Sequence, residues 1–365
     1  MHRFRFCSFF FLLWILTFAA VPSSVQVQTD PSDSASLGED SVRVVQNQAE
    51  QRVDVFVGEE RFTSYIFSRA YDVLKKPVLY PIKTASGTEV TRGYPLGNRA
   101  GERVDHPHHI GLWLNYGNVN GLDFWNNSNA VSTEEAEEMG QIVHRNVEHM
   151  ESGEGKGILE VTAGWLNPEG EPLLREETRF VFRASPSGAR MIDRITTFTA
   201  LDRSVNFTDN KEGFLGLRVT RVLEMPSDDP VLLTDASGEP AEESVMDNEG
   251  VAGYYRNSEG VEGYPAVWGK RAKWMTLSGE VKRTPVTVAI FDHPQNVGFP
   301  TYWHARDYGL FAANPLGQKV FSEGKRELNF SLAAGESTTF RYRVSVLPGK
   351  LGANKIESRY QNWIE

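Results

Sequence analysis

The chain reads Phe340-Arg341-Tyr342-Arg343-Val344-Ser345-Val346 near its C-terminal end, with apolar and polar side chains in strict alternation. Successive side chains of a β-strand point to opposite sides, so this period of two predicts a strand with one buried face. The same alternation recurs in five other segments, at residues 53–57, 159–165, 180–182, 195–201 and 286–290. The glycine and two glutamates at 58–60 separate the first of these from residues 62–67, which predicts a β-hairpin.

Helical patterns are scarce. Ser132 followed three residues later by Glu135 is a capping box and predicts a short helix over residues 133–139, and a second helix is expected over residues 355–364. Many alternating segments with one or two short helices predict an all-β fold, a large antiparallel β-sandwich in which two sheets face each other.

Composition limits the functional class. The 365 residues include 38 Lys and Arg against 48 Asp and Glu, which gives a net charge of −10. An acidic chain argues against a nucleic-acid partner, because nucleic-acid binding surfaces are basic. Gly and Pro contents are ordinary, at 32 and 18 residues, and 40% of residues are hydrophobic, so neither a fibrous nor a disordered class fits.

The first 24 residues have the pattern of a secretory signal peptide, in which Arg3 and Arg5 precede an apolar run that contains Cys7 and ends in small residues. Residues 25–44 are predicted to be a flexible tether, and residues 45–365 a single β-sandwich domain. We therefore expect an exported protein, periplasmic or extracellular. No apolar stretch after the signal peptide is long enough to span a bilayer.

Three of the eight histidines fall within four residues, in the segment Asp105-His106-Pro107-His108-His109. Pro107 stiffens the segment, and in an extended conformation His106 and His108 would point to one side and Asp105 and His109 to the other. Imidazoles on one face are typical metal ligands, with a carboxylate behind them, or general acids and bases. Both alternatives remain open at this point.

Two further clusters carry candidate residues. Asp123 and Trp125 combine a carboxylate, which bonds sugar hydroxyls, with a ring that stacks on a sugar face. Glu212 precedes a predicted strand as a candidate general base, and Arg218 lies six residues later as a candidate anion clamp.

The last cluster surrounds Trp303, His304 and Arg306. If His304 faces a pocket, Trp303 faces away from it and Arg306 shares its side. His293 follows the predicted strand at 286–291 and is a weaker candidate for substrate binding. Asn314, near the end of the segment that begins at Trp303, is a further candidate.

Together, these segments resemble a known protein family. The stretches at 105–113, 119–125, 211–218 and 303–315, with the motifs Asp-His-Pro-His-His and Trp-His-Ala-Arg-Asp-Tyr-Gly-Leu-Phe-Ala-Ala-Asn-Pro, resemble a bacterial secreted family of unknown function often labelled "methane oxygenase PmoA-like". The resemblance runs over roughly residues 45–360. It implies a supersandwich similar to that of galactose mutarotase, in a superfamily that binds sugars and uses histidine with a carboxylate.

The resulting hypothesis is a secreted carbohydrate-active enzyme, a hydrolase, lyase or epimerase. In it His106, His108 or His109 acts as acid or metal ligand, Glu212 as base and His304 as a second acid or ligand. The expected substrate contacts are Asp105, Asp123, Trp125, Arg218, His293, Trp303, Arg306 and Asn314. Two alternatives remain. One is a non-catalytic glycan-binding protein, and the other is a metal-dependent enzyme or oxygenase with zinc, copper or iron on His106, His108 and either His293 or His304.

Overall fold

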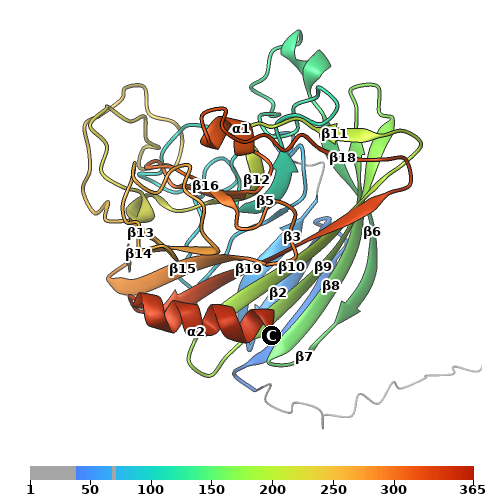
Figure 1. Ribbon diagram of the computed structural model, residues 1–365. Helices are drawn as coiled ribbons and strands as arrows, with labels where there is room; N and C mark the ends of the chain where they lie inside the picture. Colours follow the sequence, from blue (N-terminus) through green and yellow to red (C-terminus); the bar gives the residue numbers. More distant parts are fainter. Residues whose placement is uncertain (1–37, 68–70) are drawn as a thin grey trace, which may run out of the picture. The chain divides into compact units, whose positions relative to one another are not determined.

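Two large antiparallel β-sheets pack against each other in a computed structural model of the protein, which describes residues 38–67 and 71–365 (Figure 1). This confirms the predicted all-β antiparallel sandwich. The expected signal peptide, residues 1–24, and most of the expected tether lie outside the described residues. The first strand begins at Ser41, earlier than the domain boundary expected at residue 45.

The first sheet has nine strands. In spatial order they are β16 (Tyr302–Ala305), β17 (Leu310–Asn314), β12 (Gly213–Arg218), β5 (Leu112–Tyr116), β4 (Val78–Leu79), β3 (Glu60–Ile66), β2 (Arg52–Val57), β1 (Ser41–Asn47) and β7 (Gly153–Glu154). Strands distant in sequence therefore become neighbours, and β5 lies next to β12, which in turn lies next to β17.

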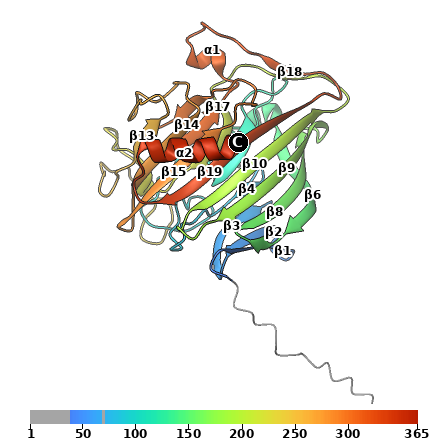
Figure 2. The same ribbon diagram turned by 60° about the horizontal axis from the view of Figure 1, so that its bottom comes forward.

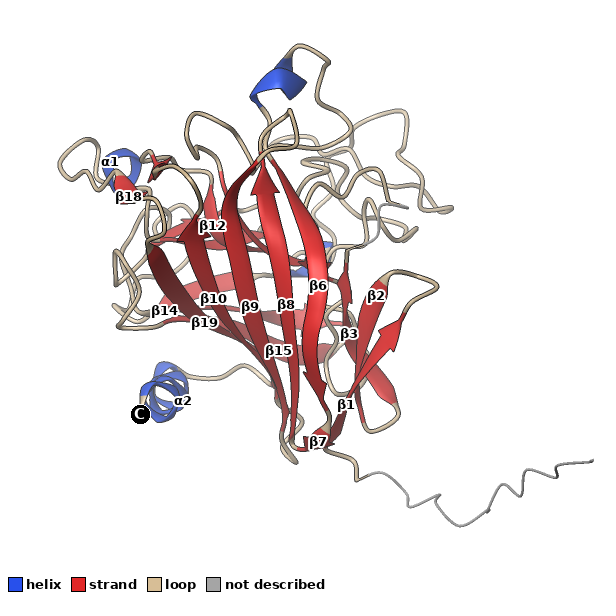
Figure 3. Ribbon diagram, turned by 90° about the vertical axis from the view of Figure 1, so that its right-hand side faces the viewer, coloured by secondary structure: helices blue, strands red, loops and turns tan. Residues whose placement is uncertain are grey.

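The second sheet has eight longer strands, of which β6, β8, β9 and β10 run side by side in Figure 3. In spatial order they are β13 (Tyr254–Asn257), β14 (Trp274–Val281), β15 (Thr284–Asp292), β19 (Ser337–Pro348), β10 (Arg190–Ala200), β9 (Pro172–Ala184), β8 (Lys156–Leu166) and β6 (Gln141–Glu151). A small pair, β11 (Val205–Phe207) and β18 (Phe330–Leu332), lies apart from both sheets in the pairing pattern. The predicted strand segments fall within β2, β8, β9, β10, β15 and β19, except that β10 ends at Ala200, one residue before the predicted end.

The predicted hairpin is confirmed in β2 and β3. Val57 pairs with Glu60, and the intervening Gly58 has a φ of 57°, a left-handed conformation that favours glycine. The alternating valines of β2 face the core on one side of this hairpin.

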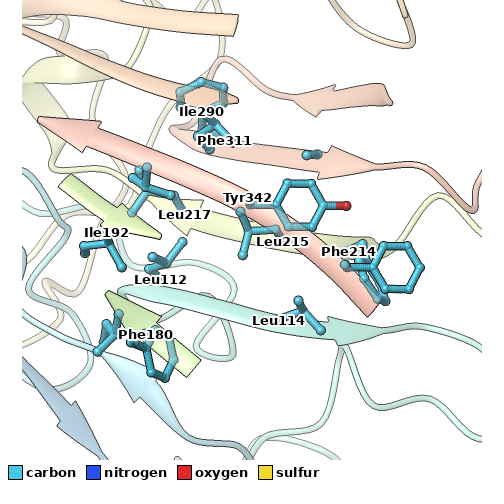
Figure 4. Packing of buried hydrophobic residues seen from close by; sticks show 14 of the residues in the cluster. Leu112, Leu114, Phe180, Ile192, Phe214, Leu215, Leu217, Ile290, Phe311 and Tyr342 are labelled. Carbon is cyan, nitrogen blue, oxygen red and sulfur yellow. The ribbon is translucent and has the colours of Figure 1, made fainter. Parts of the chain in front are cut away.

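The main core lies between the two sheets. Figure 4 shows Leu112 and Leu114 of β5 and Leu215 of β12 on one side, facing Phe180 of β9 and Tyr342 of β19 on the other. Side chains from both sheets thus close one continuous apolar layer, which is what a period of two in each strand produces.

Helices are few in the described residues. The capping box is confirmed, because the Ser132 hydroxyl accepts the Glu135 N–H at 3.2 Å and the Glu135 carboxylate accepts the Ser132 N–H at 3.0 Å. The helix that follows is a single 3-10 turn. The helical segments are η1 (Glu135–Glu138), η2 (Arg221–Leu223), α1 (Gln318–Phe321) and α2 (Ala353–Ile364).

The predicted C-terminal helix, α2, crosses the outer face of the eight-stranded sheet (Figure 2). Its Ile356 and Tyr360 pack on Trp274, Phe291 and Leu347 of that sheet. Among the described residues, no helix has the length and apolar character needed to cross a bilayer.

Burial in the core of the sandwich gives a first test. Val55 on β2 has no exposed surface, whereas Val45 on the neighbouring β1 is 43% exposed. We expect Val55→Ala to lower the free energy of unfolding by about 1–3 kcal/mol, because apolar contacts are lost and a cavity remains. Val45→Ala, the matched control, should change it by less than about 0.5 kcal/mol. Urea unfolding measures both, and equal effects would contradict the assigned faces.

Candidate functional site

A row of four residues across the nine-stranded sheet forms the floor of the candidate site. Trp113 of β5 pairs with Gly216 of β12, Gly216 pairs with Ala312 of β17, and Ala312 pairs with His304 of β16. Directly paired residues project from the same face of a sheet. This is the face turned away from the main core, because the residues that alternate with them pack between the sheets.

Gly216 lets an indole ring cross the sheet. A Cβ atom added to Gly216 would lie 2.4 Å from Cζ2 of Trp113, so this ring lies directly over the glycine. Trp113 is buried in a second apolar cluster that also contains Trp125, whose ring centroid is 5.2 Å away. Small residues in β12 and β17 thus make room for a layer of aromatic rings.

The histidine segment forms a turn above this floor. His106 has a φ of 39°, and the His109 N–H donates to the His106 carbonyl at 2.9 Å. The extended conformation expected from the sequence is therefore wrong. Proline is favoured at the second position of a β-turn, where its fixed φ is already correct, and Pro107 occupies that position.

The turn brings the three imidazoles together instead of dividing them between two sides. His106 and His109 stack with centroids 4.9 Å apart, and His108 lies 4.4 Å from His109 in an edge-on arrangement. The other face of the ring group is closed by Tyr308, which stacks on His106 at 4.7 Å. His106 is the accessible member, with 40% of its side chain exposed, whereas His108 and His109 are buried.

A fully buried guanidinium, that of Arg92, holds the turn in place. It donates to the backbone carbonyls of Arg103, Asp105, His106 and His109 at 2.8–3.1 Å. It also donates to the Asp105 carboxylate at 2.6 Å. One cation therefore fixes both the backbone and the acidic side chain of the histidine segment.

Arg218 approaches the same carboxylate from β12. Its Nη2 donates to Asp105 Oδ1 at 2.6 Å and lies 3.6 Å from the buried Glu224. Burial alone would raise the pKa of Asp105, but Arg218, His106 and Arg92 outweigh it and hold this pKa well below its usual range. Asp105 is thus an ionised support of the site, not a proton donor.

Burial keeps three of the site's histidines neutral. It lowers the pKa of His108 to about 2 and that of His304 to about 3, and it lowers the pKa of His109 well below the usual value. Neighbouring cations lower all three further, among them Lys76 for His108 and Arg306 for His304. Neutral imidazoles in such positions donate and accept hydrogen bonds but carry no charge near pH 7.

Lys76 contacts both the histidine turn and the indole ring of Trp113. Its Nζ donates to the His108 carbonyl at 2.8 Å and lies 5.5 Å from the centre of the Trp113 ring. Burial lowers the pKa of Lys76 to about 7, although the charge of Asp123 opposes the shift.

Glu212 and His304 meet at the far end of the row. Glu212 Oε2 lies 3.8 Å from His304 Nδ1, and Lys211 forms an ion pair with the other carboxylate oxygen. The Glu212 side chain is 17% exposed, so solvent or a ligand can reach it. The sequence separates these two residues widely, and the adjacency of β12, β17 and β16 brings them together.

Several hydrogen bonds hold the loop that carries Glu212. Asn314 donates to the carbonyls of Asn210 and Lys211 at 2.9 Å, and the Tyr116 hydroxyl contacts both the N–H and the carbonyl of Asn210. Asn314 was expected to contact substrate. In the structure its side-chain amide instead donates hydrogen bonds to the loop before Glu212.

Buried hydrogen-bonding atoms without a protein partner concentrate at this site. Within the part of the chain that the structure describes, they include one ring nitrogen each of His108, His109 and His304, two nitrogens of Arg218 and Nε of Arg306. The Nδ1 atom of His106 lies 3.3 Å from the Asp105 carboxylate. Native proteins leave few buried polar groups unpaired, and such groups need an explanation, for example a ligand or ordered water. The site is therefore rich in unused hydrogen-bonding capacity.

Two predicted residues lie elsewhere. His293 packs against Trp363 of α2 at 5.2 Å and accepts the Gln295 N–H, so it lies on the α2 side of the second sheet. Trp303 is fully buried in the main core, where its Nε1 donates to the Ala272 carbonyl. It faces away from His304, as the alternation predicted.

Asp123 and Trp125 have structural roles. Asp123 accepts the N–H groups of Trp125 and Asn126 at 2.7 and 3.0 Å and closes a local turn. Trp125 is fully buried, and its Nε1 donates to His109 Nε2 at 3.1 Å. Neither Trp125 nor Trp303 presents an open face on which a sugar could stack.

A metal site is not assembled by these residues. Among residues 38–67 and 71–365, no group of three His, Cys, Asp or Glu side chains is arranged to hold a metal ion. His109 Nε2 is occupied by the Trp125 N–H, and His293 is remote from the turn. The donor set expected for the metal alternative, His106 and His108 with His293 or His304, therefore does not fit.

Sequence reasoning missed Arg92, Lys76, Glu224 and Tyr308. Arg92 and Lys76 lie among ordinary loop residues, and nothing in their spacing marks them. Tyr308 is part of the motif at 303–315, and an aromatic residue two positions after Arg306 was the available signal.

Comparison with known proteins gives a family and distant structural likenesses. The profile of a family described as "Family of unknown function (DUF6807)" matches residues 52–361. No protein with a curated description matches the chain. No PmoA-like relationship emerges from these comparisons.

Three solved structures are similar at low identity. A β-arabinopyranosidase is 12% identical with a TM-score of 0.31, over 84% of this chain and 40% of its own. The Slr1438 protein from Synechocystis sp. PCC 6803 is 9% identical with a TM-score of 0.30, over 86% and 98%. A putative kojibiose phosphorylase from human microbiome is 9% identical with a TM-score of 0.31, over 89% and 33%. The chain thus spans less than half of the first and third of these proteins.

The close approach of Trp113 to Gly216 can be tested directly. Gly216→Ala should displace the indole, lower the free energy of unfolding by about 1–3 kcal/mol and change the near-ultraviolet circular dichroism of the tryptophans. Gly352→Ala is the matched control, because no atom lies within 4 Å of its added Cβ and its φ is negative. A Gly216→Ala protein with unchanged stability and spectrum would contradict the packing.

The depressed pKa of Asp105 predicts a pH dependence. A carboxylate whose native pKa lies below its unfolded value stabilises the fold above the unfolded pKa, about 4, and loses this contribution as the pH falls toward the native pKa. We expect Asp105→Asn to cost about 2–4 kcal/mol at pH 7, and the difference from wild type to shrink below about pH 4. Urea unfolding from pH 7 to pH 2 measures it, with the exposed Asp228→Asn as control. A difference that stays constant would exclude the ion pairs as its source.

Proposed function

The chain belongs to the family of unknown function DUF6807, and we propose that it is an exported enzyme that transforms a sugar at the site on the outer face of the nine-stranded sheet. The observation that carries the proposal is the accessible His106 ring beside the neutral imidazoles of His108 and His109, together with the partly exposed Glu212 next to His304. A sugar hydroxyl both donates and accepts hydrogen bonds, so a ring of hydroxyls can satisfy neutral imidazoles of either tautomer.

Glu212 is the proposed general base. It is partly exposed, it projects beside His304, and it follows a loop held by Asn314 and Tyr116. Asp105 and Glu224 are poor candidates, because Asp105 is shared by two arginines at 2.6 Å and Glu224 is completely buried.

His106 is the proposed partner acid. It is the exposed histidine of the turn, and its ring is held between His109 and Tyr308. His109 cannot take this part, because its Nε2 accepts the Trp125 N–H and burial keeps the ring neutral. His108 and His109, both buried, instead pack against the His106 ring and position it.

The proposed pair, one partly exposed carboxylate and one accessible imidazole, favours particular chemistry. A glycosidase of the usual kind needs two carboxyl groups on either side of the scissile bond. Proton removal by one group and proton delivery by another suit a lyase or an epimerase, so within the sugar-active classes we favour these two over a hydrolase.

Substitution of the proposed base tests the function. The mature protein, screened against a panel of oligosaccharides and monosaccharides, should turn over at least one of them. Glu212→Gln should reduce that turnover by about 10²–10⁴-fold and leave the unfolding transition nearly unchanged.

Glu59→Gln, an exposed carboxylate on the β2–β3 turn, is the matched control and should keep wild-type activity. Full activity in Glu212→Gln would refute the assigned base. Glycan binding without turnover of any sugar would instead identify a non-catalytic binding protein.

A further inference from the structure

Two arginine side chains converge on one tyrosine ring in the candidate site. The guanidinium carbon of Arg218 lies 5.0 Å from the centre of the Tyr308 ring, and that of Arg306 lies 5.5 Å from it. Tyr308 also stacks on His106, the proposed acid. Both cations therefore lie next to the residues expected to act on a substrate.

The two arginines differ in how their charge is balanced. Arg218 is fully buried and shares Asp105 with Arg92. Arg306 makes no ion pair within the described residues, and its Nε is buried without a hydrogen-bond partner. Its guanidinium also lies 5.6 Å from the ring of Tyr264, so two aromatic rings orient a cation whose donors remain free.

The surroundings add positive charge. Lys211 and Arg306 act on His304, and Lys76, Arg92 and Arg218 act on His108, each as a cation that disfavours protonation of the ring. The chain as a whole has a net charge of −10, so this concentration of cations is local. The two partly exposed carboxylates of the site are already paired, Asp105 with Arg92 and Arg218 and Glu212 with Lys211.

We propose that the sugar bound at this site is anionic, and that Arg306 binds its carboxylate or sulfate group. The inference rests on the proposed function, because it names the substrate class of the same site. The planar guanidinium presents two parallel N–H groups, which match the oxygens of a carboxylate or a sulfate ester. A neutral sugar would leave the charge of Arg306 unbalanced in a partly buried position.

Matched sugars test this inference. Isothermal titration calorimetry compares glucose, glucuronate and glucose 6-sulfate, and galactose, galacturonate and galactose 6-sulfate, with sodium acetate and sodium sulfate as the anions alone. We expect one or more acidic sugars to bind at least about tenfold more tightly than the matched neutral sugar, with affinity that falls as salt rises. Comparison of the titrations with the carboxylated and the sulfated sugars identifies which anionic group is recognised.

Variants assign the effect to Arg306. Arg306→Gln should remove the preference for the acidic sugar, and Arg306→Lys should restore only part of it, because lysine keeps the charge without the planar fork. Arg175→Gln, an exposed arginine on β9 paired with Glu177, is the matched control and should keep the preference. Thermal unfolding verifies that each variant is folded, and the wild-type preference stands as a test that needs no variant.

Each outcome decides the inference. Equal affinity for acidic and neutral sugars, or a preference that survives Arg306→Gln in folded protein, overturns it while the proposed sugar chemistry stands. Binding of acetate or sulfate alone, with no sugar bound, overturns both the inference and the proposed function. Arg306-dependent binding of an acidic sugar without turnover supports the inference and leaves a binding protein in place of an enzyme.

Discussion

The guanidinium of Arg92 is the contact on which the candidate site depends. The side chain is completely buried, and burial lowers its pKa to about 10, which leaves it charged at neutral pH. Four backbone carbonyls and the Asp105 carboxylate accept its hydrogen bonds. Without this cation the carbonyls of Arg103, Asp105 and His109 would lack donors, because the histidine segment belongs to neither sheet.

The same burial that positions the histidines also sets their chemistry. His108, His109 and His304 are out of contact with solvent and near cations, so their neutral forms are favoured. A cluster that looks in sequence like a set of acids, bases or metal ligands becomes a set of neutral hydrogen-bonding rings. The proposed proton transfer therefore uses His106 and Glu212, which are partly exposed and, unlike Asp105, are not held between two arginines.

Two small residues in the floor of the site leave room above the sheet. Gly216 and Ala312 leave space on the outer face of β12 and β17, and the indole of Trp113 fills part of it. On the inner face of the same strands, Leu215 and Leu217 fill the core of the sandwich. The nine-stranded sheet thus contributes side chains both to the main core and to the candidate site, because successive side chains of a strand point to opposite faces.

The sequence by itself determined the strands β2, β3, β8, β9, β10, β15 and β19, the β2–β3 hairpin and the capping box at Ser132, because these depend on near neighbours in the chain and on a period of two. It also predicted that Trp303 and His304 face opposite ways. The conformation of the histidine turn, the meeting of Glu212 with His304 and the roles of Arg92 and Tyr308 were decided by the tertiary structure. The physical reason is that strand order, which places β5, β12, β17 and β16 side by side, and the solvent exclusion that neutralises the imidazoles both arise from contacts between residues far apart in the chain.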